Sequence, residues 1–395
     1  MPDAATRRGV LAGAVTLPFF GAAARAQSSQ APAGGASPRP PAAIGTPPSV
    51  ITQPPRQFGP NAPPVISPDP DVIELDPSFR SLCIRQATLQ RVSTGYELAE
   101  GPAWSGQGQY LIFSDVKTDT LYRYIWETGQ TNVFRRPSFG TNGNTFDFAG
   151  RQISTQGFLR RVVRWEHDGR LTVLADRFDG QPFNSPNDVA PHKDGSVWFT
   201  DPLNGGTLAE GHPDDGDGPM NPGGLRDPRL GVPGTGLIGS LHQVLPPNVY
   251  RIDPDGRVDL VAPFERGLAP NGLCFSPDYA KVYIIRGGSV FVGEVAGRGL
   301  KDLRLFTDCM VDGVRCGADG LRADKAGNLW CSSSAVLGYA GVTVWDPAGK
   351  LIGRIRLPEG CANVCFAGPK RDHLFIAGVS SIYRLHLNIQ GAAPG

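Results

Sequence analysis

The 395-residue sequence has almost no net charge and no long apolar segment. Its 38 Lys and Arg residues nearly balance 37 Asp and Glu residues, which leaves a formal net charge of +1. This balance gives no sign of a surface for nucleic acid or another polyanion. The apolar stretch near the N-terminus falls well below the ~20 residues that a membrane-spanning helix needs. We therefore expect no nucleic-acid partner and no stable membrane span.

Cysteine is scarce, and its spacing does not suggest a metal site. The seven cysteines are an odd number and include no pair of Cys-x-x-Cys motifs, so a structural zinc is not expected. In an oxidising compartment Cys309 and Cys316 could close a short disulfide loop, and isolated buried thiols are an equal alternative. Cys361 and Cys365 are badly placed to pair within one straight strand.

Several catalytic signatures are also missing. The sequence contains no Gly-x-Ser-x-Gly, no His-Glu-x-x-His and no phosphate-binding glycine loop. Serine esterases, zinc metalloproteases and P-loop enzymes are recognised by these motifs, so the sequence does not favour those classes.

The N-terminus is typical of a twin-arginine export signal. Arg7 and Arg8 precede an apolar stretch that runs to Phe20, and a small-residue exit follows at Ala24-Arg25-Ala26. We predict a signal peptide over residues 1–26, with cleavage before Gln27. The twin-arginine export machinery would be a partner, and the mature protein would be periplasmic or secreted.

The next segment is rich in proline. Between Gln27 and Pro70 lie 13 prolines with much Ala, Gly and Ser. Such a composition cannot bury enough apolar surface to offset the entropy lost on ordering. We predict a disordered linker over residues 27–73, followed by one domain over residues 74–390 that is long enough to have its own core.

Six similar repeats divide this domain. Each begins with a polar residue followed by Gly or an apolar residue, and continues as a strand, a turn rich in Asp, Gly and Lys, and a second strand. The starts are 42, 45, 84, 48 and 44 residues apart, with partner hairpins between them. Repeats of 40 to 50 residues are typical of β-propellers. We predict an all-β, six-bladed propeller with four-stranded blades, in which Thr88–Val92 supplies an outer strand that closes the ring with the C-terminus.

The one long spacing contains an insertion at about 203–248. This insertion is dense in Gly and Pro and is longer than a plain connection between strands. A lid or entrance wall and a disordered surface loop are both open interpretations.

The first position of every repeat is polar. The six residues are Glu100, Asn142, Asn187, Asn271, Asp319 and Asn363. The first strand of each propeller blade lines the central channel, so these residues should converge on one axis. Two carboxylates with several amide oxygens are the donors that calcium and other hard divalent cations prefer. A turn-forming role is the alternative for an isolated asparagine, and we keep it open for Asn142 and Asn363.

Four motifs surround these starts. They are Glu-Gly-Pro-Ala-Trp at 100–104, Asn-Ser-Pro-Asn-Asp-Val at 184–189 leading to Phe-Thr-Asp-Pro at 199–202, Pro-Asn-Gly-Leu at 270–273 and Asp-Gly-Leu-Arg at 319–322. In combination they resemble the gluconolactonase and regucalcin (senescence marker protein) family. The resemblance implies a six-bladed propeller that binds one divalent cation in its channel and hydrolyses sugar lactones.

The resemblance also implies roles for individual residues. The metal ligands would be Glu100, Asn271 and Asp319, with Asn187 near the metal and in contact with substrate or water. Calcium is the first expectation for the cation, and zinc, magnesium and manganese are alternatives. One departure stands at Gln156, where related sequences carry a histidine in a Cys-Glu-His-Gly-like segment. This departure leaves the substrate, and the activity itself, open.

A lactone is a cyclic ester whose carbonyl oxygen gains negative charge when water attacks. We expect Asp319 to act as the general base with help from Asn187, and Asn142, Asn187 and Asn363 to bind the substrate. One alternative is another ester or a phosphotriester at the same metal site. Another is a non-catalytic periplasmic propeller that binds a sugar acid. We expect a monomer.

The remaining aromatic and histidine residues suggest no second site. The three tryptophans at matched strand positions, Trp104, Trp198 and Trp330, are expected to pack between blades. None of the six histidines stands at a repeat start. His192 and His242 are the weaker candidates for a place at the channel mouth.

Overall fold

The computed structural model describes residues 46–202, 245–263 and 269–394. The chain divides into two units, Met1–Thr46 and Pro47–Gly395, and the description below concerns the second. The predicted signal peptide, residues 27–45 of the predicted linker and most of the predicted insertion lie outside the described residues. Over the described part of the chain, no helix has the length and apolar character required to span a membrane.

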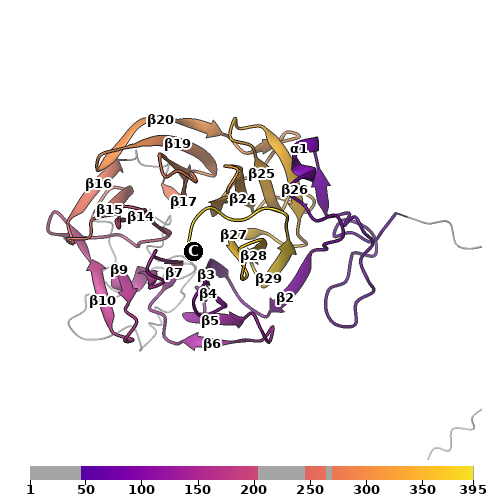
Figure 1. Cartoon of the computed structure of the whole chain (residues 1–395), viewed down its shortest axis with the longest axis horizontal. Coiled ribbons are helices and arrows are strands. Elements are labelled where there is room, and N and C mark those ends of the chain that lie inside the picture. Colours follow the sequence, from indigo (N-terminus) through magenta and orange to yellow (C-terminus); the bar gives the residue numbers. More distant parts are fainter. Residues whose placement is uncertain (1–45, 203–244, 264–268, 395) are drawn as a thin grey trace, which may run out of the picture. The chain divides into compact units, whose positions relative to one another are not determined.

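Six antiparallel sheets surround a common axis, and each contributes its first strand to the centre (Figure 1). From the centre outward, the first three sheets are β3 (Ala99–Ser105), β4 (Tyr110–Asp115), β5 (Thr120–Ile125) and β6 (Thr131–Arg135); β7 (Thr141–Phe146), β8 (Gln152–Gln156), β9 (Arg161–Trp165) and β10 (Leu171–Ala175); and β13 (Val189–Pro191), β14 (Val197–Asp201), β15 (Asn248–Ile252) and β16 (Val258–Pro263). The next three are β17 (Pro270–Phe275), β18 (Lys281–Arg286), β19 (Ser289–Ala296) and β20 (Gly299–Thr307); β23 (Leu321–Ala323), β24 (Leu329–Ser333), β25 (Gly341–Trp345), β26 (Leu351–Arg356) and β1 (Val72–Glu74); and β27 (Cys361–Ala367), β28 (His373–Gly378), β29 (Ser381–His386) and β2 (Gln90–Thr94). The predicted six-bladed propeller with four-stranded blades is confirmed, and β1 adds a fifth strand to one blade.

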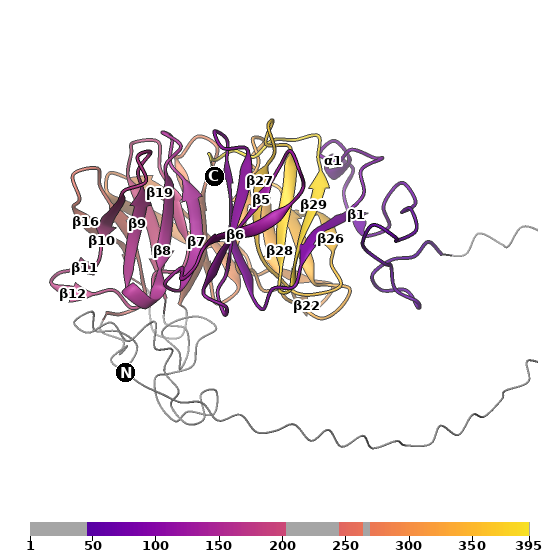
Figure 2. The same ribbon diagram turned by 90° about the horizontal axis from the view of Figure 1, so that it is seen from below.

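The N-terminal part of the domain closes the ring. Strand β2 pairs antiparallel with β29, so one blade is built from both ends of the domain. The predicted closing strand, Thr88–Val92, overlaps β2 and lies two residues earlier. Seen from the side, the strands of neighbouring blades stand next to one another (Figure 2).

Burial falls from the centre of each blade to its edge. Every residue of β3 is buried, whereas β6 at the rim has exposed positions. The rings of Trp198 and Phe275, from adjacent blades, lie 5.2 Å apart, and Trp330 meets Phe366 of the next blade at 5.7 Å. The predicted packing role of the matched tryptophans is therefore confirmed, because inner strands exclude water on both faces.

Part of the predicted disordered linker is ordered. The guanidinium of Arg56 is buried against Asp69 at 2.8 Å and Asp71 at 3.3 Å. Asp71 also accepts a hydrogen bond from the hydroxyl of Ser49 at 2.6 Å. Arg356 at the end of β26 also lies 3.2 Å from Asp71. Because buried carboxylates and guanidinium groups must be paired, this network fixes the segment to the β26 blade. The prediction of disorder is therefore wrong for residues 46–73, since composition does not reveal such pairing.

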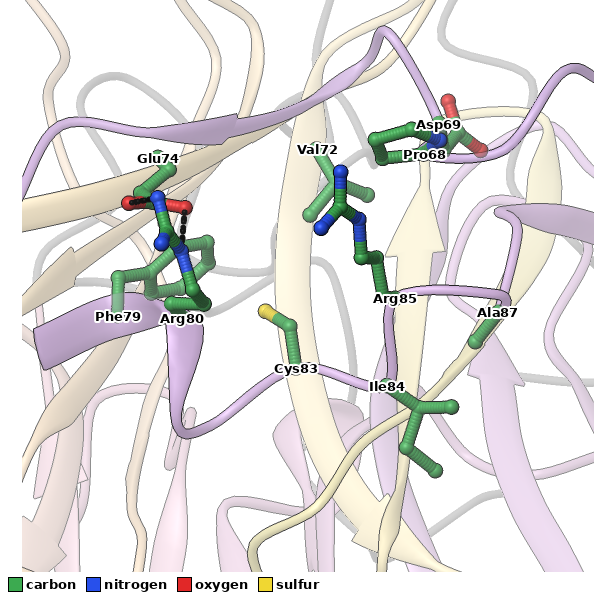
Figure 3. Close-up of a pocket in the computed structure, with 10 residues that line it drawn as sticks. All are labelled: Pro68, Asp69, Val72, Glu74, Phe79, Arg80, Cys83, Ile84, Arg85 and Ala87. Carbon is green, nitrogen blue, oxygen red and sulfur yellow. Dashed lines mark hydrogen bonds and ion pairs between the residues drawn. The ribbon is translucent and has the colours of Figure 1, made fainter. Parts of the chain in front are cut away.

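A cavity of about 360 Å³ lies between β1, helix α1 (Pro77–Arg80) and the loop that follows (Figure 3). An ion pair of 2.8 Å joins Glu74 and Arg80 beside it. Burial raises the pKa of Cys83, which also lines the cavity, to about 12, so this thiol stays protonated at neutral pH. The lining contains no residue of the inner strands, and the candidate site lies elsewhere.

The seven cysteines are free thiols. A short hairpin of β21 (Met310–Val311) and β22 (Val314–Arg315) places Cys309 opposite Cys316, and the N–H of Cys316 donates to the carbonyl of Cys309 at 2.9 Å. Of the two open alternatives, the structure has isolated buried thiols. The other short elements are η1 (Gly157–Leu159), β11 (Arg177–Phe178) and β12 (Gln181–Pro182).

The C-terminal segment crosses one end of the ring. The N–H of Lys325 donates to the carbonyl of Gln390 at 2.8 Å, and the N–H of Ala392 donates to that of Ala323 at 3.0 Å. Figure 1 shows this segment passing from the rim toward the centre. Ala323 is the last residue of β23, so the crossing is at the end where inner strands finish. The polar repeat starts lie at the other end.

Candidate active site

Glu100 and Asn363 meet where the ring closes. Glu100 is the second residue of β3 and is 2% exposed. Its Oε2 accepts hydrogen bonds from the N–H of Gly101 at 2.7 Å and from the side-chain amide of Asn363 at 3.1 Å. The two residues are 263 positions apart in sequence. The first and last repeat starts are therefore in direct contact.

Asp319 lies between the blades of Asn271 and Asn363. The carbonyl of Asp319 accepts a hydrogen bond from the N–H of Gly272 at 2.8 Å. On its other side, Gly320 lies so close to Asn363 that an added Cβ would be 2.1 Å from the side-chain Cγ. The main chain at Asp319 and Gly320 is therefore packed between the starts of the two adjacent repeats, Asn271 and Asn363, as the order of the repeats predicts.

Asn142 and Asn187 complete the ring on the other side of Glu100. The carbonyl of Asn187 accepts hydrogen bonds from the N–H of Gly143 at 2.8 Å and the hydroxyl of Thr155 at 2.8 Å. A Cβ added at Gly101 would lie 2.0 Å from the carbonyl oxygen of Asn142. Asn142 and Asn187 are both buried. The structure thus places all six predicted residues within two positions of the beginning of an inner strand.

Four of the six starts are followed by glycine, and the structure gives the reason. An added Cβ at Gly101, Gly143, Gly272 or Gly320 would lie between 2.0 and 2.5 Å from an atom of the neighbouring blade. Glycine beside a channel-lining residue could also allow close approach of the backbone to a central ligand. Their close contacts are instead with the next inner strand, which any larger residue would push away.

One buried thiol, that of Cys361, has a pKa that burial, Glu100 and Asp319 all raise. Burial raises the pKa of Cys361, at the start of β27, well above its ordinary value, and the negative charges of Glu100 and Asp319 raise it further. Both carboxylates therefore act on the same point beside the channel. They differ in access to solvent, because Glu100 is buried whereas Asp319 is half-buried.

The oxygen donors fit a hard divalent cation. Glu100 and Asp319 offer carboxylate oxygens, and Asn187 and Asn271 offer amide oxygens from two further blades. Oxygen donors of this kind suit calcium, magnesium and manganese, whereas structural zinc sites take mainly cysteine and histidine ligands. None of the repeat starts is a histidine or a cysteine.

The inner strands also contain a buried ion pair that the sequence pattern does not reveal. The carboxylate of Asp188 lies 3.6 Å from the guanidinium of Arg322, and both side chains are almost fully buried. Burial raises the pKa of Asp188, and the charge of Arg322 works against that rise. Each residue follows a repeat start by one to three positions. A charged residue at an inner strand, such as Asp188, requires a partner of opposite charge when it is buried, and this requirement was the available signal.

Asp201 was also missed, although it belongs to the Phe-Thr-Asp-Pro motif. Its two carboxylate oxygens accept hydrogen bonds from the N–H groups of Asn184 at 2.8 Å and Ser185 at 2.7 Å. Burial raises its pKa to about 7, while these hydrogen bonds and the charge of Arg160 oppose the rise. Asp201 therefore fixes the loop that leads to Asn187.

Gln156 occupies the position of the missing histidine. It is buried at the end of β8, and its Oε1 accepts a hydrogen bond from Nε of Arg161 at 2.8 Å. The neighbouring Gly157 lies close to Ser185, since an added Cβ would be 2.7 Å from its hydroxyl. The position therefore borders the loop before Asn187. A side-chain amide does not take up a proton near neutral pH, so Gln156 can donate and accept hydrogen bonds there but cannot act as a base.

The two weaker histidine candidates do not join the site. His192 follows β13, at the opposite end from Asn187, and its ring packs on Phe275 at 4.9 Å and lies 2.8 Å from the carboxylate of Asp194. His192 therefore lies at the other end of β13 from the repeat starts and is not part of the candidate site. His242 lies outside the described residues.

Comparison with known proteins adds independent information. Residues 98–380 match the family profile described as the SMP-30/Gluconolactonase/LRE-like region. The gluconolactonase of Zymomonas mobilis subsp. mobilis is 27% identical over 346 residues, which cover 81% of this chain and 87% of the relative. The pentonolactonase XacC of Haloferax volcanii is 26% identical over 300 residues, with coverage of 72% and 82%.

Solved structures give the same result for the fold. A gluconolactonase of Xanthomonas campestris has a TM-score of 0.64 and 29% identity, and covers 84% of this chain and 98% of its own. A calcium-binding regucalcin of Agrobacterium tumefaciens has a TM-score of 0.57 with 18% identity, and covers 75% and 92%. The second likeness concerns the fold alone.

Proposed function

This chain belongs to the SMP-30/gluconolactonase/LRE-like family, and from that membership we propose that it is a lactonase that opens a sugar lactone by attack of water on the ring carbonyl. The relatives named gluconolactonase and pentonolactonase support this class of reaction. The observation that carries the proposal is the hydrogen bond between Glu100 and Asn363 at the beginnings of inner strands, with Gly320, the residue after Asp319, packed against Asn363.

We infer that the channel holds one divalent cation, with calcium as the first candidate. Glu100, Asn187, Asn271 and Asp319 would hold it. When bound, such a cation supplies Lewis acidity, which stabilises the negative charge that develops on the carbonyl oxygen of a lactone during hydrolysis. The all-oxygen donor set supports this choice of cation.

The two carboxylates are assigned different tasks from their environments. Glu100 is buried and hydrogen-bonded to Gly101 and Asn363, so it is held in one position and is suited to fixing a ligand. Asp319 is half-buried, so water and the released proton can reach it. We propose that Asp319 takes the proton from the attacking water, and that Asn187 orients this water.

The neutral amides are assigned to substrate recognition. A sugar lactone presents several hydroxyl groups, and an amide can both donate to and accept from a hydroxyl. Asn142, Asn187 and Asn363 contribute such groups at the same end of the ring. Gln156, which borders the same region, adds a neutral donor and acceptor where relatives carry histidine, and we propose that it shifts the preference among lactones.

The first test is hydrolysis of glucono-1,5-lactone, followed by proton release. Mature protein stripped of metal would be assayed with calcium, zinc, magnesium or manganese added back, beside Glu100→Ala. We expect turnover that depends on the metal and is lost in the variant. A parallel assay with a pentonolactone would compare the two classes of lactone that the relatives' names suggest.

Tight metal binding without turnover of any lactone would contradict the proposal. A panel of other esters and a phosphotriester would then test the alternative hydrolase at the same metal site. Binding of a sugar acid without turnover of any substrate would instead identify a non-catalytic propeller.

Export is proposed from the sequence alone. The twin-arginine pattern at residues 1–26 supports a periplasmic or secreted location and transport in the folded state. Replacement of both Arg7 and Arg8 by lysine is expected to leave the protein in the cytoplasm, and fractionation of cells would measure this.

A further inference from the structure

A second group of metal-ligating side chains lies outside the channel. His373 begins β28 and His386 ends β29, and the two residues are directly opposite one another in the sheet. Their rings are stacked, with centroids 4.0 Å apart and planes inclined by 6°. Asp372 joins them, because its carboxylate lies 2.8 Å from Nδ1 of His373 and 3.6 Å from Nε2 of His386.

These three residues can share one ion. One potential ligand atom from each lies within 4.8 Å of the others. Two imidazoles and a carboxylate form a donor set for zinc and for similar transition metals such as copper and nickel. This set differs in kind from the all-oxygen donors of the channel. We propose that Asp372, His373 and His386 form a separate surface site for a transition-metal ion, with zinc as its natural occupant.

The site is partly preorganised. The rings of Trp126 and His373 make an edge-to-face contact, with centroids 4.8 Å apart and an interplanar angle of 78°, and the N–H of Leu387 donates to the carbonyl of Asp372 at 2.8 Å. Two ligands are therefore held by packing and backbone contacts. In a stacked pair the nitrogen lone pairs do not point at a common position, so one ring must tilt. The His386 side chain is 44% exposed and has room to do so.

A nearby positive charge is held by other groups. Arg384 precedes His386 by two residues in β29, so the two side chains share one face of the sheet. The guanidinium of Arg384 lies over the ring of Trp126 at 5.4 Å and donates to the side chain of Gln90 at 2.6 Å. These contacts hold Arg384 toward β2 and toward the neighbouring blade. Burial lowers the pKa of His373 and the charge of Arg384 adds to this effect, so the ion would meet two imidazoles and one carboxylate with one cation nearby.

The position suggests what the ion would do. It would link β28 to β29, and β29 is the strand that pairs with β2 to close the ring. An ion that binds only the folded chain stabilises it in proportion to the logarithm of its concentration. Zinc should therefore raise the unfolding temperature by strengthening the blade that holds both ends of the domain.

The test uses untagged mature protein carrying Glu100→Gln, which weakens the channel site, so that the surface site is measured alone. Zinc titration by calorimetry should give one site, and adding His386→Asn should weaken its affinity at least about tenfold. The matched control is His167→Asn, because His167 is an exposed histidine in another blade and outside this group. This control should leave zinc binding unchanged.

A second measurement identifies the ligands directly. Copper(II) bound to the Glu100→Gln protein should give an electron paramagnetic resonance spectrum with coupling to two imidazole nitrogens, and His386→Asn should remove one of them. Equal unfolding temperatures of the two proteins without metal would show that the variant is folded. Equal zinc affinity with and without His386 would overturn the proposal, and so would a copper spectrum unaffected by its replacement. Because lactone hydrolysis is not the readout, the result does not depend on the proposed function.

Discussion

Single residues at the polar end of the channel are distinguished by burial and by their hydrogen bonds. Glu100 is held by two donors, whereas Asp319 keeps contact with solvent. Asp188 lies among the same strands and is committed to an ion pair with Arg322, so it is not available as a base. The three carboxylates therefore differ in their surroundings: one is fixed by hydrogen bonds, one is accessible to solvent and one is neutralised by a buried arginine.

Replacing the proposed base should separate metal binding from turnover. Asp319→Asn keeps an oxygen donor of similar size but cannot take a proton from water near neutral pH. We expect the rate of lactone hydrolysis to fall by about 10²-fold or more while measurable metal binding is retained. Initial rates and metal titration on the same preparation would check this. Undiminished activity would rule out the base role.

Asp201 should give stability a dependence on pH with a definite sign. Its pKa in the folded protein, about 7, lies above its ordinary value of 3.8. Between these two values the folded chain binds more protons than the unfolded chain, so the contribution of Asp201 is fully present below pH 4 and is lost as pH rises toward 7.

The variant Asp201→Asn does not titrate in this window. Relative to it, the wild-type free energy of unfolding should fall with rising pH between 4 and 7, by at most about 1.4 kcal/mol per pH unit. Denaturant unfolding of both proteins at several pH values would measure the difference. If the free energy of unfolding had the same pH dependence in both proteins, the pKa of Asp201 would not be raised in the folded state.

Four of the repeat starts are followed by a position that packs so closely on the neighbouring blade that only glycine fits there. In these inner strands the polar residue faces the channel, and the next residue lies against the neighbouring blade. The contacts of Gly101 with Asn142 and of Gly320 with Asn363 show that this spacing is set by main chain and short side chains. A larger side chain in one inner strand should therefore displace the repeat-start residue that the next blade contributes to the candidate site.

This displacement can be tested at Gly272. An added Cβ would lie 2.4 Å from the carbonyl oxygen of Asp319, so Gly272→Ala should cost about 1–3 kcal/mol of stability and weaken metal binding in the channel. Gly106→Ala is the matched control, because no atom lies within 4 Å of its added Cβ, and its effect should stay within about 0.5 kcal/mol. Equal stability of the two variants would contradict the interpretation that close packing at Gly272 requires glycine.

On the scale of the folded domain, closure is achieved by the segment before the first blade. Strand β2 covers the edge of β29, and Phe79 of helix α1 packs on Trp330 at 6.0 Å between their ring centroids. The ion network of Arg56 fixes the chain upstream of both. The proline-rich region thus contains part of the structure that holds the ring shut.

A shortened chain should reveal how much this closure contributes. A protein that begins at residue 96 lacks β1, α1 and β2, and loses the burial of Phe79, which alone is worth about 3–5 kcal/mol. The uncovered edge of β29 should also promote self-association. Thermal unfolding and size-exclusion chromatography would be compared with a chain that begins at residue 46. A monomer with unchanged stability would show that closure does not depend on this segment.

The fold and the place of the site followed from local pattern. The period of the repeats, the alternation within strands and the polar first residue are all visible along the sequence, because the first three strands of every blade are consecutive in the chain. This is why the six-bladed propeller, the closing strand near Thr88–Val92 and the six converging residues could be predicted. The chemical roles of those six residues stay predictions.

The remaining features depend on partners far apart in the chain. Asp188 meets Arg322, and Asp71 meets Arg356, only after the blades and the preceding segment are packed together, and neither pair has a local signature. The contact of Glu100 with Asn363 exists because the ring closes on itself. Sequence periodicity fixed which residues face the axis, whereas packing between blades determined their neighbours, because those distances are set by how adjacent inner strands fit against one another.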